Sequence, residues 1–248
     1  MNIAALVKLV PDTEASLKIG DDRRYISTTD INFVLNPYDE YAVEEALKVK
    51  EKESGSVTVF SLGGDEAVKA LRNSLAMGAD EAIHVKSPGG LDMFGVAKAL
   101  AGALKEKSFD VIFAGKQAVD DDCGAIGPMV AEMLGIPHVS NIIKLELSGG
   151  KAIAEREIET GIEVFEVPLP CLFTAQKGLN EPRYASLKGI MMAKKKQINE
   201  VQAETDTART EVLNLEYPPV RPPGKIVGQG AEAVPELIKL LKEEAKVL

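Results

Sequence analysis

The sequence has little of the material that metal sites and disulfide frameworks require. It holds two cysteines, Cys123 and Cys171, and they do not have the C-x-x-C spacing of a metal motif. It also has only two histidines and no tryptophan among its 248 residues. We therefore predict free, reduced thiols and little histidine-based acid–base or metal chemistry.

Basic residues are outnumbered by acidic ones, and the chain has no long apolar run. The chain has 29 lysines and arginines against 38 aspartates and glutamates, a net charge of −9, which disfavours nucleic-acid binding because a nucleic-acid binder needs a basic face. No apolar run approaches the ~20 residues of a membrane span. The apolar start is broken by Lys8 and Pro11, unlike a signal peptide. We expect a cytoplasmic protein whose 45% hydrophobic residues form an ordinary core.

The first 139 residues alternate between strand and helix patterns. Apolar runs predict strands at 3–10, 57–61, 81–85 and 110–114, and helical periodicity with stop signals predicts helices at 39–52, 65–77, 93–107 and 126–134. This alternation predicts an α/β fold with a parallel sheet flanked by helices on both faces.

After residue 139 the pattern changes to short strands joined by turns that contain glycine or proline. They fall at 142–147, 151–158, 162–167 and 171–175 and predict an appended antiparallel segment. The stretch 179–198 begins without regular periodicity and carries Tyr184, Leu187 and two methionines. We predict an exposed loop that serves a partner. Lys194–Lys196 is either a solvated helix end or an attractant for an acidic partner.

The chain ends in a polar segment followed by an amphipathic pattern. Prolines at 218, 219, 222 and 223 predict an extended arm. The apolar stripe within 234–246 predicts a helix that docks either on its own body or on a second chain. We divide the chain into an α/β domain, residues 1–198, and a C-terminal arm and helix, residues 199–248, that packs on a partner.

Three predicted strand-to-helix turns carry glycine or polar residues: Asn36–Asp39, Ser61–Asp65 and Gly115–Gly127. Carboxyl ends of parallel strands share one edge of a sheet, so the convergence of these turns predicts a nucleotide cleft. Each turn alone is equally consistent with a plain helix cap, with Asp39, Asp65 or one of Asp120–Asp122 as the capping residue.

The turn after the strand at 110–114 is the strongest of the three as a phosphate site, because a helix N-terminus offers free N–H groups. Its three aspartates would repel a phosphate unless backbone amides or Lys116 offset them. The turn has neither the Walker nor the G-x-G-x-x-G pattern. Ser61–Asp65 is weakly similar to the S-G-G-x-D-S loop of ATP pyrophosphatases. An adenine-nucleotide hydrolase or adenylyl-transfer enzyme, with Mg²⁺ on Asp120–Asp122, is therefore the alternative hypothesis.

Ordered motifs run along nearly the whole chain. They are V-K-x-V at Val7–Val10, N-P-Y at Asn36–Tyr38, A-V-E-E-A at Ala42–Ala46, L-A-M-G-A-D at Leu75–Asp80, G-K-Q-A-x-D-D-D-C at Gly115–Cys123, E-R-E-I at Glu155–Ile158 and L-N-E-P-R-Y at Leu179–Tyr184. With these motifs the chain resembles electron transfer flavoprotein beta subunits.

The resemblance implies an adenine-nucleotide-hydrolase-like α/β fold without hydrolase activity, working as an electron carrier rather than an enzyme. It implies a heterodimer in which the alpha subunit holds the redox FAD and this subunit completes its site. It further implies that electrons arrive from acyl-CoA or other flavin dehydrogenases and leave to a membrane quinone reductase.

The resemblance also implies particular site residues. The contacts of a buried AMP would be Leu6, Asn36, Pro37, Tyr38, Asp39, Leu62, Gly115, Lys116, Gln117, Ala118, Val119, Asp120, Asp121, Asp122, Cys123, Gly124, Ala125 and Ile126. Thr13 and Tyr38 would lie near the flavin, Glu157 would hold the mobile flavin domain of the alpha subunit, and Leu187 would insert into a dehydrogenase.

The chain departs from the family pattern at three places. The usual C-N-Q-T is C-G-A-I at Cys123–Ile126, so backbone amides would replace two polar side chains at the phosphate. Electron-bifurcating relatives hold a second FAD in this cleft, usually with D-G-D-T-A-Q-V-G, and Asp121 stands where that loop has glycine. We favour AMP and keep a second FAD as the alternative. Lys188 and Met192 replace a common proline and lysine, which leaves the partner dehydrogenase open.

Overall fold

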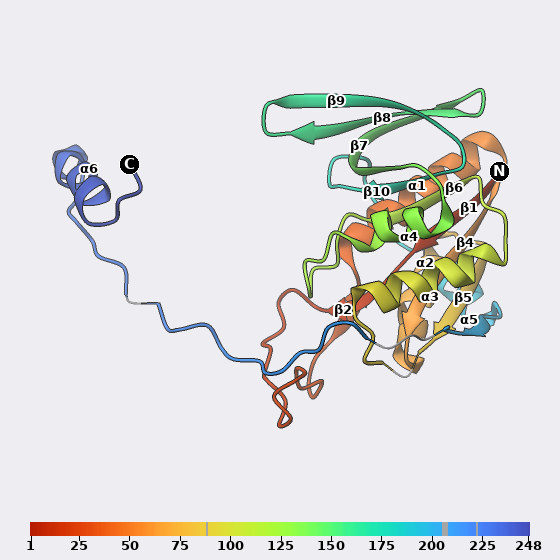
Figure 1. Cartoon of the computed structure of the whole chain (residues 1–248), viewed down its shortest axis with the longest axis horizontal. Coiled ribbons are helices and arrows are strands. Elements are labelled where there is room, and N and C mark those ends of the chain that lie inside the picture. The colour runs from red at the N-terminus through yellow and green to blue at the C-terminus, as the bar shows by residue number, and fades with distance from the viewer. Residues whose placement is uncertain (88, 205–207, 222) are drawn as a thin grey trace.

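A nine-stranded sheet forms the centre of the molecule, which we describe from a computed structural model at residues 1–87, 89–204, 208–221 and 223–248 (Figure 1). In spatial order its strands are β11 (Asn199–Gln202), β5 (Glu81–Lys86), β4 (Ser56–Gly63), β1 (Asn2–Leu6), β6 (Val111–Gly115), β10 (Cys171–Ala175), β7 (His138–Ser148), β8 (Lys151–Ile158) and β9 (Gly161–Pro168). Neighbours from β11 to β7 are parallel, and β8 and β9 add antiparallel pairing. The predicted fold class is confirmed.

Helices cover both faces of the parallel part. Helices α1 (Pro37–Glu53) and α2 (Val68–Met77) bury their apolar residues with Ile3 and Ala5 on one face, whereas α3 (Met93–Lys105) and α4 (Ile126–Leu134) pack with Ala4 and Leu6 on the other. Alternate residues of the central strand β1 therefore pack into two separate cores, one on each face of the sheet, as expected for a strand that is buried on both faces. In the described part of the chain, no helix is both long and apolar enough to cross a membrane.

The first strand is shorter than predicted. Strand β1 ends at Leu6, and a separate strand, β2 (Leu9–Pro11), pairs with β3 (Phe33–Leu35) in a small antiparallel sheet. The sheet ladder stops because the N–H of Lys8 donates to the carboxylate of Asp39 instead of to a neighbouring strand. The continuous apolar run concealed this break, because an apolar run does not show where a strand's hydrogen bonds end.

The strand at Cys171–Ala175 was wrongly predicted to be antiparallel. As β10 it lies between β6 and β7 and runs parallel to both. All five of its residues are buried, which suits a central position in the sheet. Cys171 is one of two free cysteines, and burial raises the pKa of its thiol to about 12. Cys123, the other free cysteine, is partly exposed.

The stretch predicted as a loop contains a helix, α5 (Leu187–Lys195). The hydroxyl of Ser186 caps it by accepting the N–H of Gly189 at 3.0 Å. Gly189 lets α5 approach α2 closely, because a Cβ at this position would collide with the carbonyl oxygen of Ala76. Lys196 is not a free solvated charge, since its ammonium donates to the carbonyl oxygen of Ala79 at 2.6 Å.

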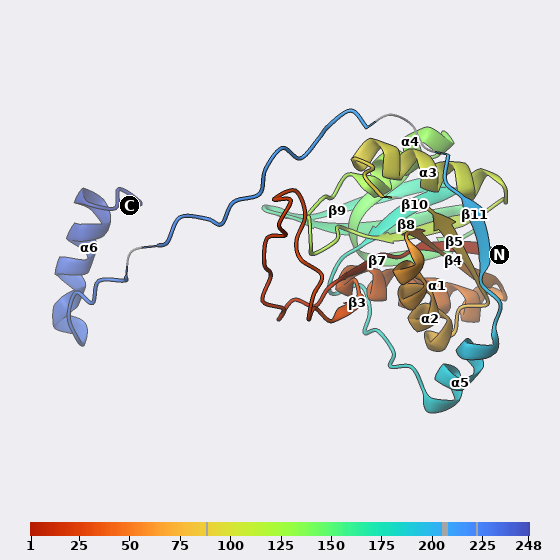
Figure 2. The same cartoon turned by 90° about the horizontal axis from the view of Figure 1, so that it is seen from below.

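The C-terminal region leaves the α/β body after one more strand. Residues 199–202, which we assigned to the arm, form edge strand β11 beside β5. The chain then extends to the short 3₁₀ turn η2 (Ala231–Ala233) and helix α6 (Val234–Glu243), which stands apart from the α/β body in both views (Figures 1 and 2). No residue of α6 is buried. Pro222 and residues 205–207 of the predicted arm lie outside the described residues.

Candidate functional site

A cleft of about 470 Å³ opens at the carboxyl ends of β1, β4 and β6. Its apolar wall is made by Leu6, Leu62, Val96, Leu100, Ala114 and Ile126, and its polar side includes Lys8, Asp39, Asp92, Lys116, Gln117, Asp121 and Thr210. The chain leaves β1 toward α1 on one face and leaves the adjacent β6 toward α4 on the other. The cleft therefore lies at a topological switch point, where open α/β sheets bind ligands, and its size is typical of small-molecule sites.

Asp39 joins the two strands at this switch point. Its carboxylate accepts the N–H of Lys8, just after β1, at 2.7 Å and the N–H of Gly115, at the end of β6, at 3.1 Å. A Cβ at Gly115 would collide with the same carboxylate, so only glycine fits this approach. The expectation that Asp39 caps α1 is therefore wrong. Its carboxylate instead fixes the two strand ends that border the cleft.

Asn36 holds the loop that follows β6. Its side-chain amide donates to Asp39 at 2.9 Å and to the carbonyl oxygen of Gln117 at 2.9 Å, and its side-chain oxygen accepts the N–H of Val119 at 3.2 Å. The residue is completely buried. It thus positions the loop through the loop's backbone, a contact that joins residues more than 80 positions apart.

Burial raises the pKa of Asp39 to about 7. Hydrogen bonds from Asn36 and from the N–H groups of Lys8 and Gly115 oppose this shift because they favour the charged form. The carboxyl group therefore titrates close to neutral pH, with three donors aimed at it and the cleft beside it.

Lys8 forms ion pairs with two of the three aspartates in the loop. Its ammonium lies 2.8 Å from Asp120 Oδ1 and 2.9 Å from Asp121 Oδ2. Although partial burial lowers the pKa of Lys8, the two carboxylates raise it above its ordinary value. The third carboxylate, on Asp122, accepts a hydrogen bond from Gln117 Nε2 at 2.6 Å. One of the three negative charges is thus offset by Lys8, and each of the three carboxylates is engaged by a donor within the protein.

The N-terminus of α4 faces this cleft without a side-chain cap. Its first residue, Ile126, lines the cleft, and no described residue accepts a hydrogen bond from the N–H groups of Gly124, Ala125 or Ile126. None of the aspartates in the loop caps this helix, contrary to one expectation, since Asp121 accepts the N–H of Cys123 at 2.9 Å instead. Free N–H groups at a helix N-terminus form a favourable environment for an anion.

The structure brings together much of the predicted contact set. The cleft is lined by Leu6, Asp39, Leu62, Gly115, Lys116, Gln117, Ala118, Asp121, Cys123 and Ile126. Four of the other predicted residues form hydrogen bonds or ion pairs with residues of the site: Asn36, Val119, Asp120 and Asp122. The centre of the Tyr38 ring lies 4.7 Å from the ammonium of Lys116. Pro37 opens α1, and Gly124 and Ala125 precede α4.

Sequence reasoning missed the contribution of Lys8, Asp92 and Thr210. The V-K-x-V motif contains Lys8, but nothing in the motif indicates that its ammonium reaches residues 120 and 121. The turn Ser61–Asp65 gives only Leu62 to the cleft, and Asp65 pairs with Lys86 at 3.2 Å instead of capping a helix.

The predicted partner-facing residues are all exposed. Glu157 lies near the end of β8 and Thr13 lies in the segment after β2. Leu187 begins α5 with 82% of its surface exposed, and Met191 on the same helix is 65% exposed. These residues lie on the surface, and none of them lines the cleft.

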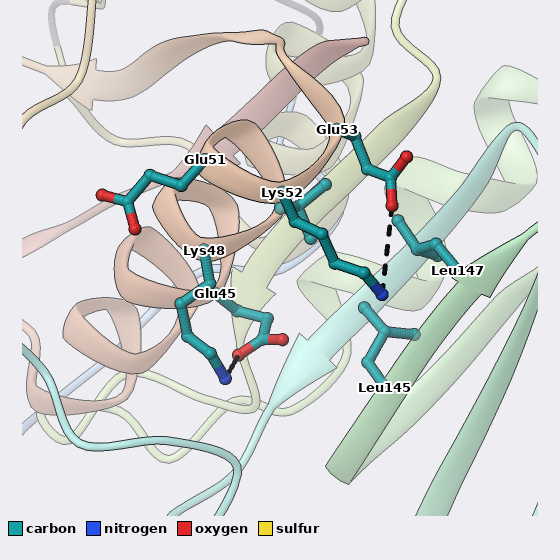
Figure 3. Close-up of a pocket in the computed structure, with 8 residues that line it drawn as sticks. Glu45, Lys48, Glu51, Lys52, Glu53, Leu145 and Leu147 are labelled. Carbon is teal, nitrogen blue, oxygen red and sulfur yellow. Dashed lines mark hydrogen bonds and ion pairs between the residues drawn. The ribbon is translucent and has the colours of Figure 1, made fainter.

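A second hollow, of about 480 Å³, lies between α1 and β7 (Figure 3). The charged side chains of α1 meet Leu145 and Leu147 of β7 there, and Lys48 pairs with Glu45 at 3.0 Å. This hollow is reached from the C-terminal half of α1, whereas Asp39 lies in the first turn of that helix. None of the predicted cofactor-binding residues lines it.

The fold is that of a doubly wound α/β protein with a cleft at its switch point. The model of the electron transfer flavoprotein domain matches residues 25–206. The chain is 40% identical to the electron transfer flavoprotein subunit beta of Bacillus subtilis, with both chains covered completely. It is 38% identical to that of Mus musculus, over 97% of this chain and 96% of the relative. The chain therefore belongs to the electron transfer flavoprotein family, as a beta subunit.

Proposed function

We propose that this chain holds an AMP as a structural ligand in the cleft and, together with an alpha subunit, completes the site of a redox FAD. The observation that carries the proposal is the convergence of Leu6, Asp39, Leu62 and the loop 115–126 on one cleft at the switch point. Membership in the electron transfer flavoprotein family supports the electron-carrying role.

The groups in the cleft suit an adenylate. The apolar wall offers a surface for the adenine ring, and the free N–H groups at the start of α4 together with Lys116 offer donors to a phosphate. The two residues that replace polar side chains of the family pattern, Gly124 and Ala125, leave their backbone N–H groups available. An AMP bound only to the folded chain would stabilise it by mass action.

In this proposal the subunit is an electron carrier and not an enzyme. The FAD, when bound to the alpha subunit, supplies the redox chemistry. Thr13 and Tyr38 border its site, and Glu157 holds the flavin domain of the alpha subunit. The exposed apolar residues of α5 dock on acyl-CoA or other flavin dehydrogenases, and a quinone reductase accepts the electrons.

Counting the ligands of the purified heterodimer tests the proposal. We expect one FAD and one AMP per heterodimer, and a yellow protein that a dehydrogenase with its substrate reduces. Two flavins and no AMP would show that a second FAD occupies the cleft, as in a bifurcating type. A colourless complex that cannot be reduced, or turnover of ATP with Mg²⁺, would contradict the proposal.

Leu187 allows a direct test of docking. Leu187→Ala should slow electron transfer from the dehydrogenase about tenfold or more, because a buried aliphatic anchor at an interface contributes about 1.5–3 kcal/mol. The flavin content should stay unchanged. Leu17→Ala, at an exposed leucine of the segment between β2 and β3, is the control. Equal rates for both variants and the wild type would remove the docking role of α5.

A further inference from the structure

We propose that residues 208–217, the first part of the C-terminal arm, form a strap that closes the cleft, and that Asp92 is the residue that holds the strap. The strap is defined here by these residues alone. The inference deepens the proposed function, since it rests on an adenylate being bound in this cleft, and it assigns the arm a role in retaining that ligand.

Asp92 makes two kinds of contact with its two oxygen atoms. Oδ1 accepts the N–H of Gly95 at 2.9 Å and thereby caps α3. Oδ2 accepts the N–H of Arg209 at 2.7 Å, the N–H of Thr210 at 3.1 Å and the hydroxyl of Thr210 at 3.5 Å. These hydrogen bonds lower the pKa of Asp92, and the bond from the N–H of Gly95 contributes most. The carboxylate is therefore charged when it holds the strap. The guanidinium of Arg209 also lies 3.5 Å over the ring of Phe94.

This contact lies at the mouth of the cleft. Asp92 and Thr210 both line the cleft, next to Leu91 and Met93. Thr210 is the residue through which the arm, far along the sequence from every other lining residue, reaches the site. A ligand held between α3, α4 and the strand ends therefore has the strap as part of its enclosure.

The remainder of the strap is fixed to the segment between β2 and β3. Glu211 pairs with Arg24 at 2.7 Å, the N–H of Leu215 donates to the carbonyl oxygen of Arg23 at 2.6 Å, and the hydroxyl of Tyr217 accepts the N–H of Ile19 at 3.0 Å. Both views show the arm running beside this segment before it turns away toward α6 (Figures 1 and 2). The strap thus borders the cleft at Thr210 and is fixed, beyond the cleft, to the segment between β2 and β3.

The contacts of the strap are polar and exposed, whereas those of the cleft floor are buried. Segments held in this way open at a lower free-energy cost than the core does. We therefore infer that opening of the strap, and not unfolding of the sheet, sets the rate at which the adenylate leaves.

Two variants test the contact between Asp92 and the strap, one on each partner. In Asp92→Ser the serine can still cap α3, but its side chain is too short to reach the arm. Thr210→Pro removes one N–H and the hydroxyl that the arm donates to Asp92. Val220→Pro, the same kind of change beyond the strap at a residue that is 96% exposed, is the control. The measurement is the exchange of bound AMP for isotopically labelled AMP in the heterodimer with its alpha subunit, followed by mass spectrometry.

We expect both strap variants to exchange AMP about tenfold faster or more, the effect of losing hydrogen bonds to one charged group, while Val220→Pro exchanges like the wild type. Hydrogen exchange within 208–217 should rise in the same two variants. Equal AMP exchange in all four proteins overturns the strap and leaves the adenylate site intact. A wild-type heterodimer that neither retains nor binds labelled AMP overturns the adenylate site, and the strap with it.

Discussion

Asp39 occupies the first turn of α1, yet its carboxylate accepts the N–H groups of Lys8 and Gly115 from two other segments. An aspartate at the start of a helix is ordinarily explained by capping or by the helix dipole. Here the same residue joins the ends of two parallel strands, and the glycine at 115 makes the approach sterically possible. The shape of the cleft therefore depends on a single buried carboxyl group.

The substitution Asp39→Asn tests this dependence. An asparagine would present an N–H₂ group to one of the three donors that face residue 39, leaving a buried N–H without an acceptor. We expect a loss of about 1–3 kcal/mol in the free energy of unfolding, measured by urea denaturation of the adenylate-free protein. Glu40→Gln, at the exposed neighbouring position, should change it by less than about 0.5 kcal/mol. Equal stability of both variants would contradict the joining role.

Asp39 also predicts a pH dependence. Burial raises its folded-state pKa to about 7, above the value of about 4 in an unfolded chain. The folded state then binds a proton more tightly, so the stability that this group adds at low pH is lost as the pH rises from about 4 to about 7. The free energy of unfolding of the wild type, relative to Asp39→Asn, should therefore be larger at pH 5 than at pH 8. The reverse order would show that the three N–H donors outweigh burial.

Among the elements, sequence patterns predicted the four helices on the faces of the sheet and the strands between them. Those elements have buried stripes or apolar runs, and such patterns depend on local sequence alone. The patterns did not predict the parallel position of β10 or the pairing of β11, because strand order depends on contacts between distant segments. They also missed α5, whose signals are a serine cap and a glycine packed against α2.

In the candidate site, too, the features set by local sequence could be predicted and the contacts between distant residues could not. The turns at the strand ends could be predicted, since strand–helix alternation places them at one edge. The resemblance supplied the individual contacts, and the structure gathered ten of them around the cleft. The partners of the charged groups could not be predicted, because Lys8 meets Asp120 and Asp121 across more than 110 residues. Thr210 could not be predicted either, since an irregular arm has no periodicity to place it.

The extended segment before α5 is fixed to α1 by a charged cluster. Arg183 donates to Glu44, at 2.8 and 2.9 Å, and to Glu51, and Asn180 donates to the carbonyl oxygen of Tyr41 at 3.0 Å and to Glu45 at 2.9 Å. The side chain of Glu44 is only 7% exposed. The L-N-E-P-R-Y motif therefore anchors the segment that presents α5.

Arg183→Gln should loosen that segment. The substitution leaves the nearly buried Glu44 without its charged partner, and since Arg183 itself is about one-third exposed we expect a local cost of about 1–2 kcal/mol. Amide hydrogen exchange at residues 180–190 should accelerate by roughly tenfold. Lys151→Gln, which removes an exposed pair with Glu166, should leave exchange there unchanged. Protection at 180–190 equal to that of the wild type would show that the cluster does not anchor the segment.

On the scale of the whole molecule, the chain has a self-sufficient α/β body and an arm whose last helix has no partner within the described residues. The body buries its apolar residues in two cores, one on each face of the sheet. In α6, by contrast, Val234, Leu237 and Ile238 remain 42–48% exposed. Since an amphipathic helix of ten residues is not stable by itself in water, we propose that α6 folds against the alpha subunit.

The double substitution Leu237→Ser and Ile238→Ser should therefore weaken the heterodimer without unfolding this chain. Burying each side chain contributes about 1.5–3 kcal/mol, so we expect the dissociation constant for the alpha subunit to rise by about 100-fold or more, measured by sedimentation of the two labelled subunits. Lys239→Ser and Lys242→Ser, at polar positions of the same helix, form the control and should change it by less than about threefold. Thermal unfolding of the isolated chain should be the same for all of these proteins, because α6 adds nothing to either core. If the apolar double variant binds the alpha subunit as tightly as the control does, α6 does not dock on the alpha subunit.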